Sequence, residues 1–200
     1  TGGIDLSQGS ILGLAGCIGA SYIYSGNTFL GIIAALGLGL FSGLLNGAMI
    51  TFIKLPPFIA TLGLSQIGRG LVIAFMYGNV IWGFDKSFRF LGAGNILGIP
   101  VPILIAIIVL FISYFILHYT TYGRSVYLVG SNRSAATHAG IDVKWTILRT
   151  YMFSGMISAF VGLMYIARLN SAESGLGTGF ELDSVAAAVM GGTSFMGGVG

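Results

Sequence analysis

Long apolar runs alternate with short polar connections along this chain. Four runs have the length and composition of membrane-spanning helices, which need about 20 mainly apolar residues; they cover residues 7–25, 29–52, 101–119 and 147–167. A fifth run, 57–77, is long enough but contains Gln66 and Arg69. A sixth begins near Glu181 and reaches the last residue of the sequence. The pattern predicts an all-α, polytopic membrane helix bundle.

The composition agrees with a membrane location. Apolar residues make up 55% of the 200 residues and charged residues 8%, whereas about one quarter of the residues in an ordinary globular domain are charged. The net charge of +3 does not indicate a nucleic-acid partner. Cys17 is the single cysteine, so we expect neither a disulfide framework nor a thiolate metal cluster, and no cofactor or metal ion.

Basic residues in the connections predict the orientation. The polar segment 120–146 and its flank contain Arg124, Arg133, Lys144 and Arg149, and the turn at 52–57 contains Lys54. Counting the predicted spans places these two connections on the same side. By the positive-inside rule, we expect that side to be cytoplasmic.

Small residues recur along one face of the second run. Gly31, Ala35, Gly39, Gly43 and Gly47 are spaced every four residues, so another helix can approach that face closely. This spacing fits plain helix packing, and it also fits a tight contact beside a transport pathway.

Polar side chains inside the apolar runs are candidates for a translocation pathway. Thr61, Ser65 and Arg69 share one face of the run 57–77, Gln66 lies beside them, and Asn46 lies in the second run. A charged residue inside a membrane helix normally faces protein or water. These residues could form the wall of a polar passage. Alternatively, the arginine could pair with one acid or reach a membrane interface.

Two short stretches resemble each other. "GIDLS" at 3–7 and "GFELD" at 179–183 both contain a glycine, an apolar residue, an acid, a leucine and a short polar residue. Asp5 or Ser7, and Asp183, are natural helix N-caps, and Glu181 adds an acid near a positive helix end. Five predicted spans separate the stretches, so they should point in opposite directions. An inverted repeat with broken or re-entrant helices would produce this arrangement, although chance or simple capping explains the likeness equally well.

The segment "GSNRSAATHAGIDVK" at 130–144 is a polar island in an apolar chain. Ser131 or Asn132 can cap a helix at 133–139, and Gly140 can end it in the left-handed conformation. A helix of two turns is not stable alone. It is either a knob that docks on a cytoplasmic partner or a solvated loop with incidental helix.

Four stretches together resemble the sugar permeases of ribose/galactose-type bacterial ATP-binding-cassette (ABC) importers: "TGGIDLSQGSILGLAG", "LPPFIATLG", "TTYGRSVYLVGSNRSAATHAGI" and "ELDSVAAAVMGGTSFMGGVG". The resemblance implies that the short helix within 122–141 engages the ATPase subunit. It points to these coupling residues: Asn132, Arg133, Ala135, Ala136 and Gly140. Gln8 and His138 depart from the commoner family pattern.

The resemblance also implies a cellular setting. It predicts a multi-pass protein of the bacterial cytoplasmic membrane, in contact with lipid and three protein partners. These are a cytoplasmic ABC ATPase subunit, a periplasmic or lipid-anchored sugar-binding protein, and a second permease chain. Family members are longer at both ends. We therefore expect residues 1–200 to be part of a single permease domain, with 120–146 as its cytoplasmic coupling loop.

Three function classes remain to be compared. A permease that moves a monosaccharide is favoured, and it would not itself be an enzyme, because no lysine here follows a glycine as in a P-loop. An ion-coupled secondary transporter is the alternative, but the acids lie at predicted helix starts rather than inside helices. An intramembrane aspartyl protease would have to pair Asp5 with Asp183, and their opposite orientation should place them on different membrane sides.

Overall fold

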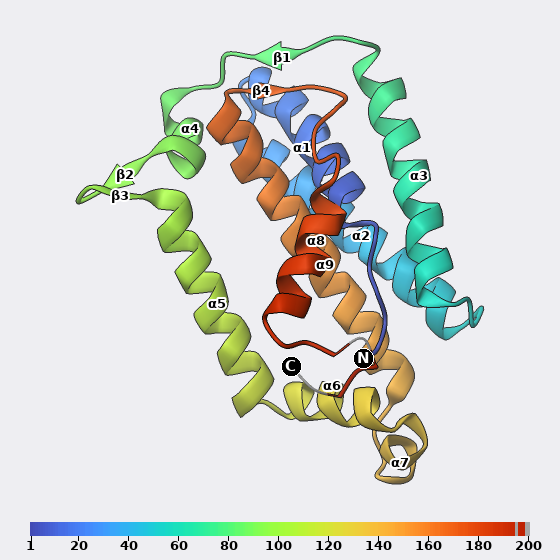
Figure 1. The fold of residues 1–200 in the computed structure, drawn as a ribbon. Coiled ribbons are helices and arrows are strands. Elements are labelled where there is room, and N and C mark those ends of the chain that lie inside the picture. Colours follow the sequence, from blue (N-terminus) through green and yellow to red (C-terminus); the bar gives the residue numbers. More distant parts are fainter. Residues whose placement is uncertain (195, 199–200) are drawn as a thin grey trace.

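The computed structural model describes residues 1–194 and 196–198 as a helical bundle (Figure 1). The longer helices are α1 (Gln8–Tyr24), α2 (Thr28–Thr51), α3 (Pro57–Met76), α5 (Val101–Tyr119) and α8 (Val143–Leu169). The shorter ones are α4 (Lys86–Ala93), α6 (Thr121–Ser131), α7 (Arg133–His138) and α9 (Phe180–Met190). Four two-residue strands complete the described elements: β1 (Ile81–Trp82), β2 (Asn95–Ile96), β3 (Ile99–Pro100) and β4 (Ser171–Ala172). The predicted all-α polytopic bundle is confirmed.

Four of these helices are long and apolar enough to cross a membrane: α2, α3, α5 and α8. The expectation that residues 7–25 form a clear span needs correction. The helix there, α1, has 17 residues, which rise only about 25 Å. It is also the helix most enclosed by the protein, with buried residues on all its faces. By contrast, α3 is long and apolar enough to span a membrane, although it contains Gln66 and Arg69.

The small-residue face of α2 is a packing face. All five of its predicted members are buried. A Cβ added to Gly39 would lie 2.5 Å from the Cβ of Ala159, and one added to Gly43 would lie 2.7 Å from the Cα of Met152. The backbones of α2 and α8 therefore touch, and the packing interpretation is sufficient to explain the four-residue spacing.

The connections lie on the sides that the crossing count predicts. The turn after α2 and the pair α6–α7 lie at the same end of the bundle (Figure 1). The Nζ atom of Lys144, which follows α7, lies 5.8 Å from the ring centroid of Phe52 in the turn after α2. The two connections are therefore in contact. At the opposite end, β1 pairs antiparallel with β4, with Ile81 opposite Ala172. The hairpin of β2 and β3 also lies away from α7.

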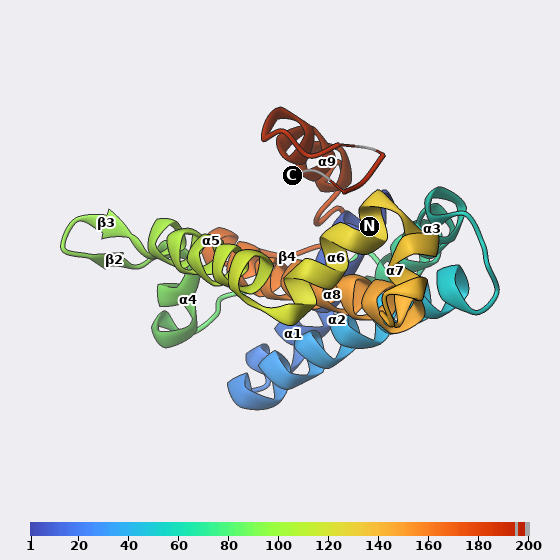
Figure 2. The same cartoon turned by 90° about the horizontal axis from the view of Figure 1, so that it is seen from below.

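Two helices begin inside the bundle rather than at its ends. Residues 1–7 run inward without helical structure before α1 starts, and residues 173–179 return into the bundle before α9 starts (Figure 1). The two helices then run in opposite directions, as the repeated motif predicts. Seen along the bundle, α9 lies on one side of α8 and α2 on the other (Figure 2).

The position of the two helix starts corrects one sequence-based expectation. Asp5 and Asp183 were expected on different membrane sides. Instead, the starts of α1 and α9 meet, because a Cβ on Gly9 would run into the Oε2 atom of Glu181 and the carbonyl oxygen of Gly177. The expectation assumed that helices begin at a membrane surface, which does not hold for broken helices.

Helix α6 was not predicted, because its 11 residues are only partly apolar. The side chain of Thr120 caps its start by accepting a hydrogen bond from the amide of Gly123 at 3.1 Å. Since Gly123 lies against the carbonyl oxygens of Ile116 and Leu117, the chain can turn sharply there from α5 into α6. Helix α6 thereby connects a spanning helix directly to α7.

Candidate functional site

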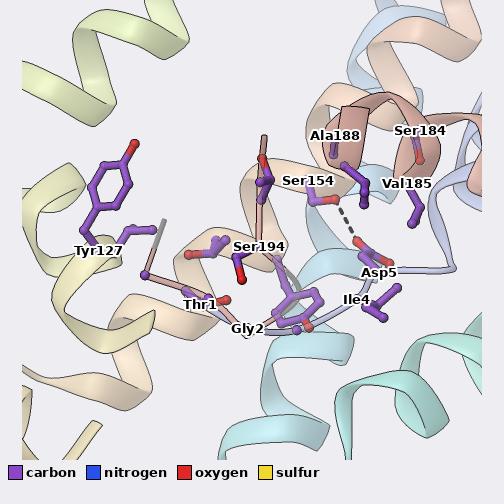
Figure 3. Close-up of a pocket in the computed structure, with 18 of the residues that line it drawn as sticks. Thr1, Gly2, Ile4, Asp5, Tyr127, Ser154, Ser184, Val185, Ala188 and Ser194 are labelled. Carbon is purple, nitrogen blue, oxygen red and sulfur yellow. Dashed lines mark hydrogen bonds between the residues drawn. The ribbon is translucent and has the colours of Figure 1, made fainter. Parts of the chain in front are cut away.

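The start of α1 is held by a network of short polar side chains. Asp5 Oδ1 accepts hydrogen bonds from the amide of Ser7 at 3.0 Å and from its hydroxyl at 2.6 Å. Asp5 Oδ2 accepts one from Ser154 Oγ at 2.7 Å (Figure 3), and Asn46 donates from Nδ2 to Ser7 Oγ at 2.7 Å. The network ties the segment before α1 to α2 and α8.

The helix N-caps of α1 and α9 differ from those that the sequence predicts. Ser7 is the N-cap residue of α1, but its side chain accepts no capping hydrogen bond from the helix; its hydroxyl donates to Asp5 instead. The N-cap of α9 is Gly179, so the prediction of Asp183 as a cap was wrong. Asp183 and Glu181 lie in the first turn of α9, where their charge still suits the positive helix end.

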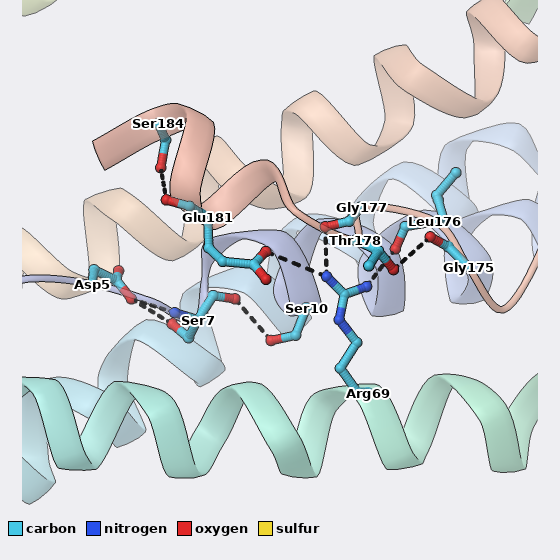
Figure 4. Close-up of polar contacts among 10 residues, drawn as sticks. All are labelled: Asp5, Ser7, Ser10, Arg69, Gly175, Leu176, Gly177, Thr178, Glu181 and Ser184. Carbon is cyan, nitrogen blue, oxygen red and sulfur yellow. Dashed lines mark hydrogen bonds and ion pairs between the residues drawn. The ribbon is translucent and has the colours of Figure 1, made fainter. Parts of the chain in front are cut away.

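Arg69 holds the start of α9 against α3. Its Nη1 donates to the carbonyl of Leu176 at 2.8 Å, and its Nη2 donates to the carbonyl of Gly177 at 2.5 Å (Figure 4). Nη2 also lies 3.4 Å from Glu181 Oε2. The sequence left open whether Arg69 pairs with one acid or reaches a membrane interface, and the structure favours pairing with an acid, Glu181.

Replacing Arg69 with leucine should destabilise the fold by about 2–3 kcal/mol, because hydrogen bonds to a charged group are lost and two carbonyls and a carboxylate are left without that partner. The measurement is the unfolding free energy in detergent. Gln66→Leu is the matched control, because Gln66 is exposed on the same helix and should change stability by less than about 0.5 kcal/mol. Equal stability of the two variants would contradict the anchoring role.

A cavity of about 370 Å³ lies between the N-terminal segment and residues of five helices, α1, α5, α6, α8 and α9. Hydroxyl-bearing residues of α8 and α9 form one part of its wall, and Tyr127 of α6 lies across from them (Figure 3). Its polar lining residues are Thr1, Asp5, Gln8, Tyr127, Thr150, Tyr151, Ser154, Ser184, Thr193 and Ser194. The wall of the cavity therefore combines polar and apolar groups.

The predicted pathway residues do not line this cavity. Asn46, Thr61 and Ser65 are buried, whereas Gln66 is exposed. Thr61 donates to the carbonyl of Pro57 at 2.9 Å and to that of Ile4 at 3.2 Å, so it fixes the N-terminal segment. The Oδ1 atom of Asn46 has no hydrogen-bond partner among the described residues. Their role in translocation stays a prediction.

Sequence reasoning missed the hydroxyls of α8, although a signal was present. Thr146, Thr150, Ser154 and Ser158 recur every four residues on one face of this helix. Thr150 and Ser154 line the cavity. The Thr150 hydroxyl also contacts the Tyr122 hydroxyl of α6 at 3.0 Å, and burial raises the pKa of Tyr122. A polar stripe at helical spacing in an apolar run could have pointed to this wall.

The polar island folds as predicted. Asn132 caps α7 by accepting a hydrogen bond from the amide of Ala135 at 3.0 Å, and Gly140 ends the turn with a φ of +79°. Asn132, Arg133, Ala135 and Gly140 are exposed. Ala136 is not: it is 2% exposed and packs within a cluster of the chain's own residues, Ile50, Ala60, Val129, Ile147 and Tyr151.

The burial of Ala136 corrects its expected use. The residue was expected to face a partner, but it fixes α7 to the bundle. An exposed coupling surface can include the other four predicted residues. Their coupling role stays a prediction.

The sequence of this chain matches one family model over residues 1–199, described as the permease component of the branched-chain amino acid transport system. The chain belongs to this permease family. As a member of the family with four span-length apolar helices, this permease is a multi-pass protein of the bacterial cytoplasmic membrane.

Several curated relatives of this permease are named for sugars. The ribose import permease protein RbsC of Bacillus subtilis is 41% identical over 203 residues, which cover 100% of this chain and 63% of the relative. The D-allose transport system permease protein AlsC of Escherichia coli is 39% identical, with 99% and 61% covered. The galactofuranose transporter permease protein YtfT of Escherichia coli is 34% identical, with 99% and 59% covered. No solved structure matches this permease. The chain spans about three fifths of the length of these relatives.

Proposed function

We propose that this chain is part of the permease subunit of an ABC importer that moves a monosaccharide across the cytoplasmic membrane. The observation that carries the proposal is the similarity of the whole chain to permeases named for ribose, allose and galactofuranose, at 34–41% identity. Residues 1–200 then belong to a single transmembrane domain, with 120–146 as its cytoplasmic coupling loop.

The proposed partners follow from what the chain must obtain from elsewhere. Each lysine of this sequence is preceded by Ile, Asp or Val rather than by the Gly of a P-loop, so a separate ATPase subunit supplies the energy. A periplasmic or lipid-anchored binding protein delivers the sugar. A second permease chain completes the pathway. The surface offered to the ATPase consists of the exposed residues Asn132, Arg133, Ala135 and Gly140.

The mechanism we propose is alternating access. ATP binding moves the ATPase subunits, and α7 moves with them. Because α7 is packed on the bundle through Ala136 and continues from α6, its displacement reaches α6 and the end of α5. The permease would thereby switch the side on which its pathway opens.

One competing substrate class and one competing energy source have less support. The family description mentions branched-chain amino acids, but the similar curated relatives carry sugar names. An ion-coupled secondary transporter would use a free acid inside the bundle. The buried acid Asp5 instead has both carboxylate oxygens engaged by hydroxyl or amide donors.

The test is reconstitution of the full-length permease with its ATPase subunit and binding protein in liposomes. We expect uptake of radiolabelled D-ribose or D-allose that requires ATP and persists when ion gradients are collapsed by ionophores. Uptake that needs no ATP but stops with the ionophore would support the ion-coupled alternative instead. ATP-dependent uptake of L-leucine without sugar uptake would overturn the substrate class.

A further inference from the structure

We propose that the 370 Å³ cavity between the N-terminal segment, α6, α8 and α9 is a transit site for an uncharged monosaccharide. This inference rests on the proposed function and assigns the place in the chain where the substrate pauses. The cavity differs from the pathway that the sequence suggested. None of the five predicted pathway residues lines it: Asn46, Thr61, Ser65, Gln66 and Arg69.

The size and wall of the cavity suit a small polar molecule. Its volume lies in the range of small-molecule sites, about 300–1,000 Å³. Apolar side chains such as Val185 and Ala188 of α9 alternate with hydroxyls such as Ser184 and Ser154 (Figure 3). Tyr127 lies across from this wall (Figure 3). An amphipathic ring with many hydroxyls can contact both kinds of surface.

The hydroxyls of the wall are arranged to accept hydrogen bonds. Ser184 Oγ donates its proton to the carbonyl of Glu181 at 3.0 Å, and Ser154 Oγ donates to Asp5 at 2.7 Å. Thr150 Oγ1 is 2.8 Å from the carbonyl of Thr146, to which it donates. A hydroxyl has one proton and two lone pairs. Ser154 already accepts from Gln8 Nε2 at 3.4 Å, and Thr150 from the Tyr122 hydroxyl at 3.0 Å, so each keeps one lone pair for a ligand. Ser184 donates to a carbonyl and keeps its acceptor capacity. A ligand rich in O–H donors matches that capacity.

The charge of the wall favours a neutral ligand over an amino acid. Asp5 is the only charged side chain among the described lining residues, and it already accepts three hydrogen bonds. A zwitterion also needs a cationic partner for its carboxylate. None of the described lining residues has a cationic side chain, and Arg69 lies outside this wall and binds the carbonyls of Leu176 and Gly177.

The cavity lies next to the element that leads to α7. A Cβ on Gly130 of α6 would lie 2.5 Å from the amide nitrogen of Gly198, and one on Gly198 would lie 2.8 Å from the Cα of Ser131. Gly197 and Gly198 line the cavity. A movement of α7 that shifts α6 would therefore loosen the cavity wall at this contact and open a route for the sugar.

The first test fills the cavity from α9. Ala188 lines it, whereas the adjacent Ala187 does not, and both side chains are exposed within the described chain. In the full-length transporter, Ala188→Phe should lower ATP-driven D-ribose uptake by about tenfold or more. Ala187→Phe should preserve uptake. Copurification of the ATPase subunit is expected with both variants, which excludes a folding defect.

The second test detects occupancy without transport. Ala188→Cys in the assembled transporter is labelled with a small thiol reagent in the presence of D-ribose, D-allose, D-fructose or L-leucine. Cys17 is buried, so the unsubstituted protein gives the background. At least one sugar should slow labelling severalfold, and L-leucine should not.

The outcomes separate this inference from the function on which it rests. A wild-type transporter that imports no sugar with ATP would refute the proposed function and the site together. If the wild type imports sugar, but Ala188→Phe transports normally and no sugar protects Ala188→Cys, the cavity alone is refuted. Protection by L-leucine and not by sugars would also contradict the site.

Discussion

Replacing Gly43 with leucine should leave almost no folded permease. A Cβ at this position would already lie 2.7 Å from the Cα of Met152 and press on the carbonyl oxygen of Tyr151. Both neighbours are backbone atoms, which a rotamer change cannot move. Overpacking a core costs about 1–3 kcal/mol or more, and a leucine here would have to separate α2 from α8. Domains are stable by only about 5–15 kcal/mol, so we expect the loss of most of that stability.

Gly37 provides the matched control on the same helix. A Cβ added there meets no atom within 4 Å. Gly37→Leu should therefore accumulate in the membrane like the unsubstituted permease. The measurement is the monodisperse fraction after detergent extraction, followed by size-exclusion chromatography. Comparable yields of the two variants would show that the α2–α8 contact does not govern folding.

A tryptophan at Ala135 should uncouple the permease from its ATPase subunit. Ala135 is exposed on α7, beside the buried Ala136 that fixes this helix. A bulky ring would project beyond the methyl group that it replaces and prevent close approach. Loss of about 2 kcal/mol of docking free energy, typical of a central interface residue, corresponds to roughly 30-fold weaker association. ATP-driven sugar uptake should fall with it.

Copurification of the ATPase subunit with full-length permease measures this effect directly. Ser87→Trp is the control, because Ser87 is exposed on α4 at the opposite end of the bundle. We expect normal recovery of the ATPase with Ser87→Trp and strongly reduced recovery with Ala135→Trp. Reduced recovery with Ser87→Trp alone would reverse the proposed orientation. Undiminished recovery with Ala135→Trp would remove α7 from the coupling surface.

Local patterns in the sequence predicted much of the architecture. The apolar runs located the long helices, and the four-residue spacing of Gly31, Ala35, Gly39, Gly43 and Gly47 identified a packing face. The cap at Asn132 and the turn at Gly140 were also correct. These features depend on residues within one or two helical turns, where sequence spacing fixes geometry.

The errors concern contacts between distant segments. Asp183 was taken for a cap, but the left-handed conformation of Gly179 starts α9 earlier. Spacing along the sequence also did not predict that Asn46 Nδ2 donates a hydrogen bond to the hydroxyl of Ser7, 39 positions away. The resemblance placed Ala136 among the coupling residues, and the sequence did not predict that α7 packs on the chain and buries it. No local spacing encodes these pairings, because they depend on how the broken helices enter the bundle.

The unequal burial of the helices determines which part can move. Within the described chain, α9 buries none of its own residues, whereas α1, α2 and α8 are joined through backbone contacts at their glycines. The start of α9 is nevertheless anchored, because Arg69 holds Leu176, Gly177 and Glu181 there. A movement of α9 would therefore pivot at this anchored start and leave the backbone contacts among α1, α2 and α8 intact.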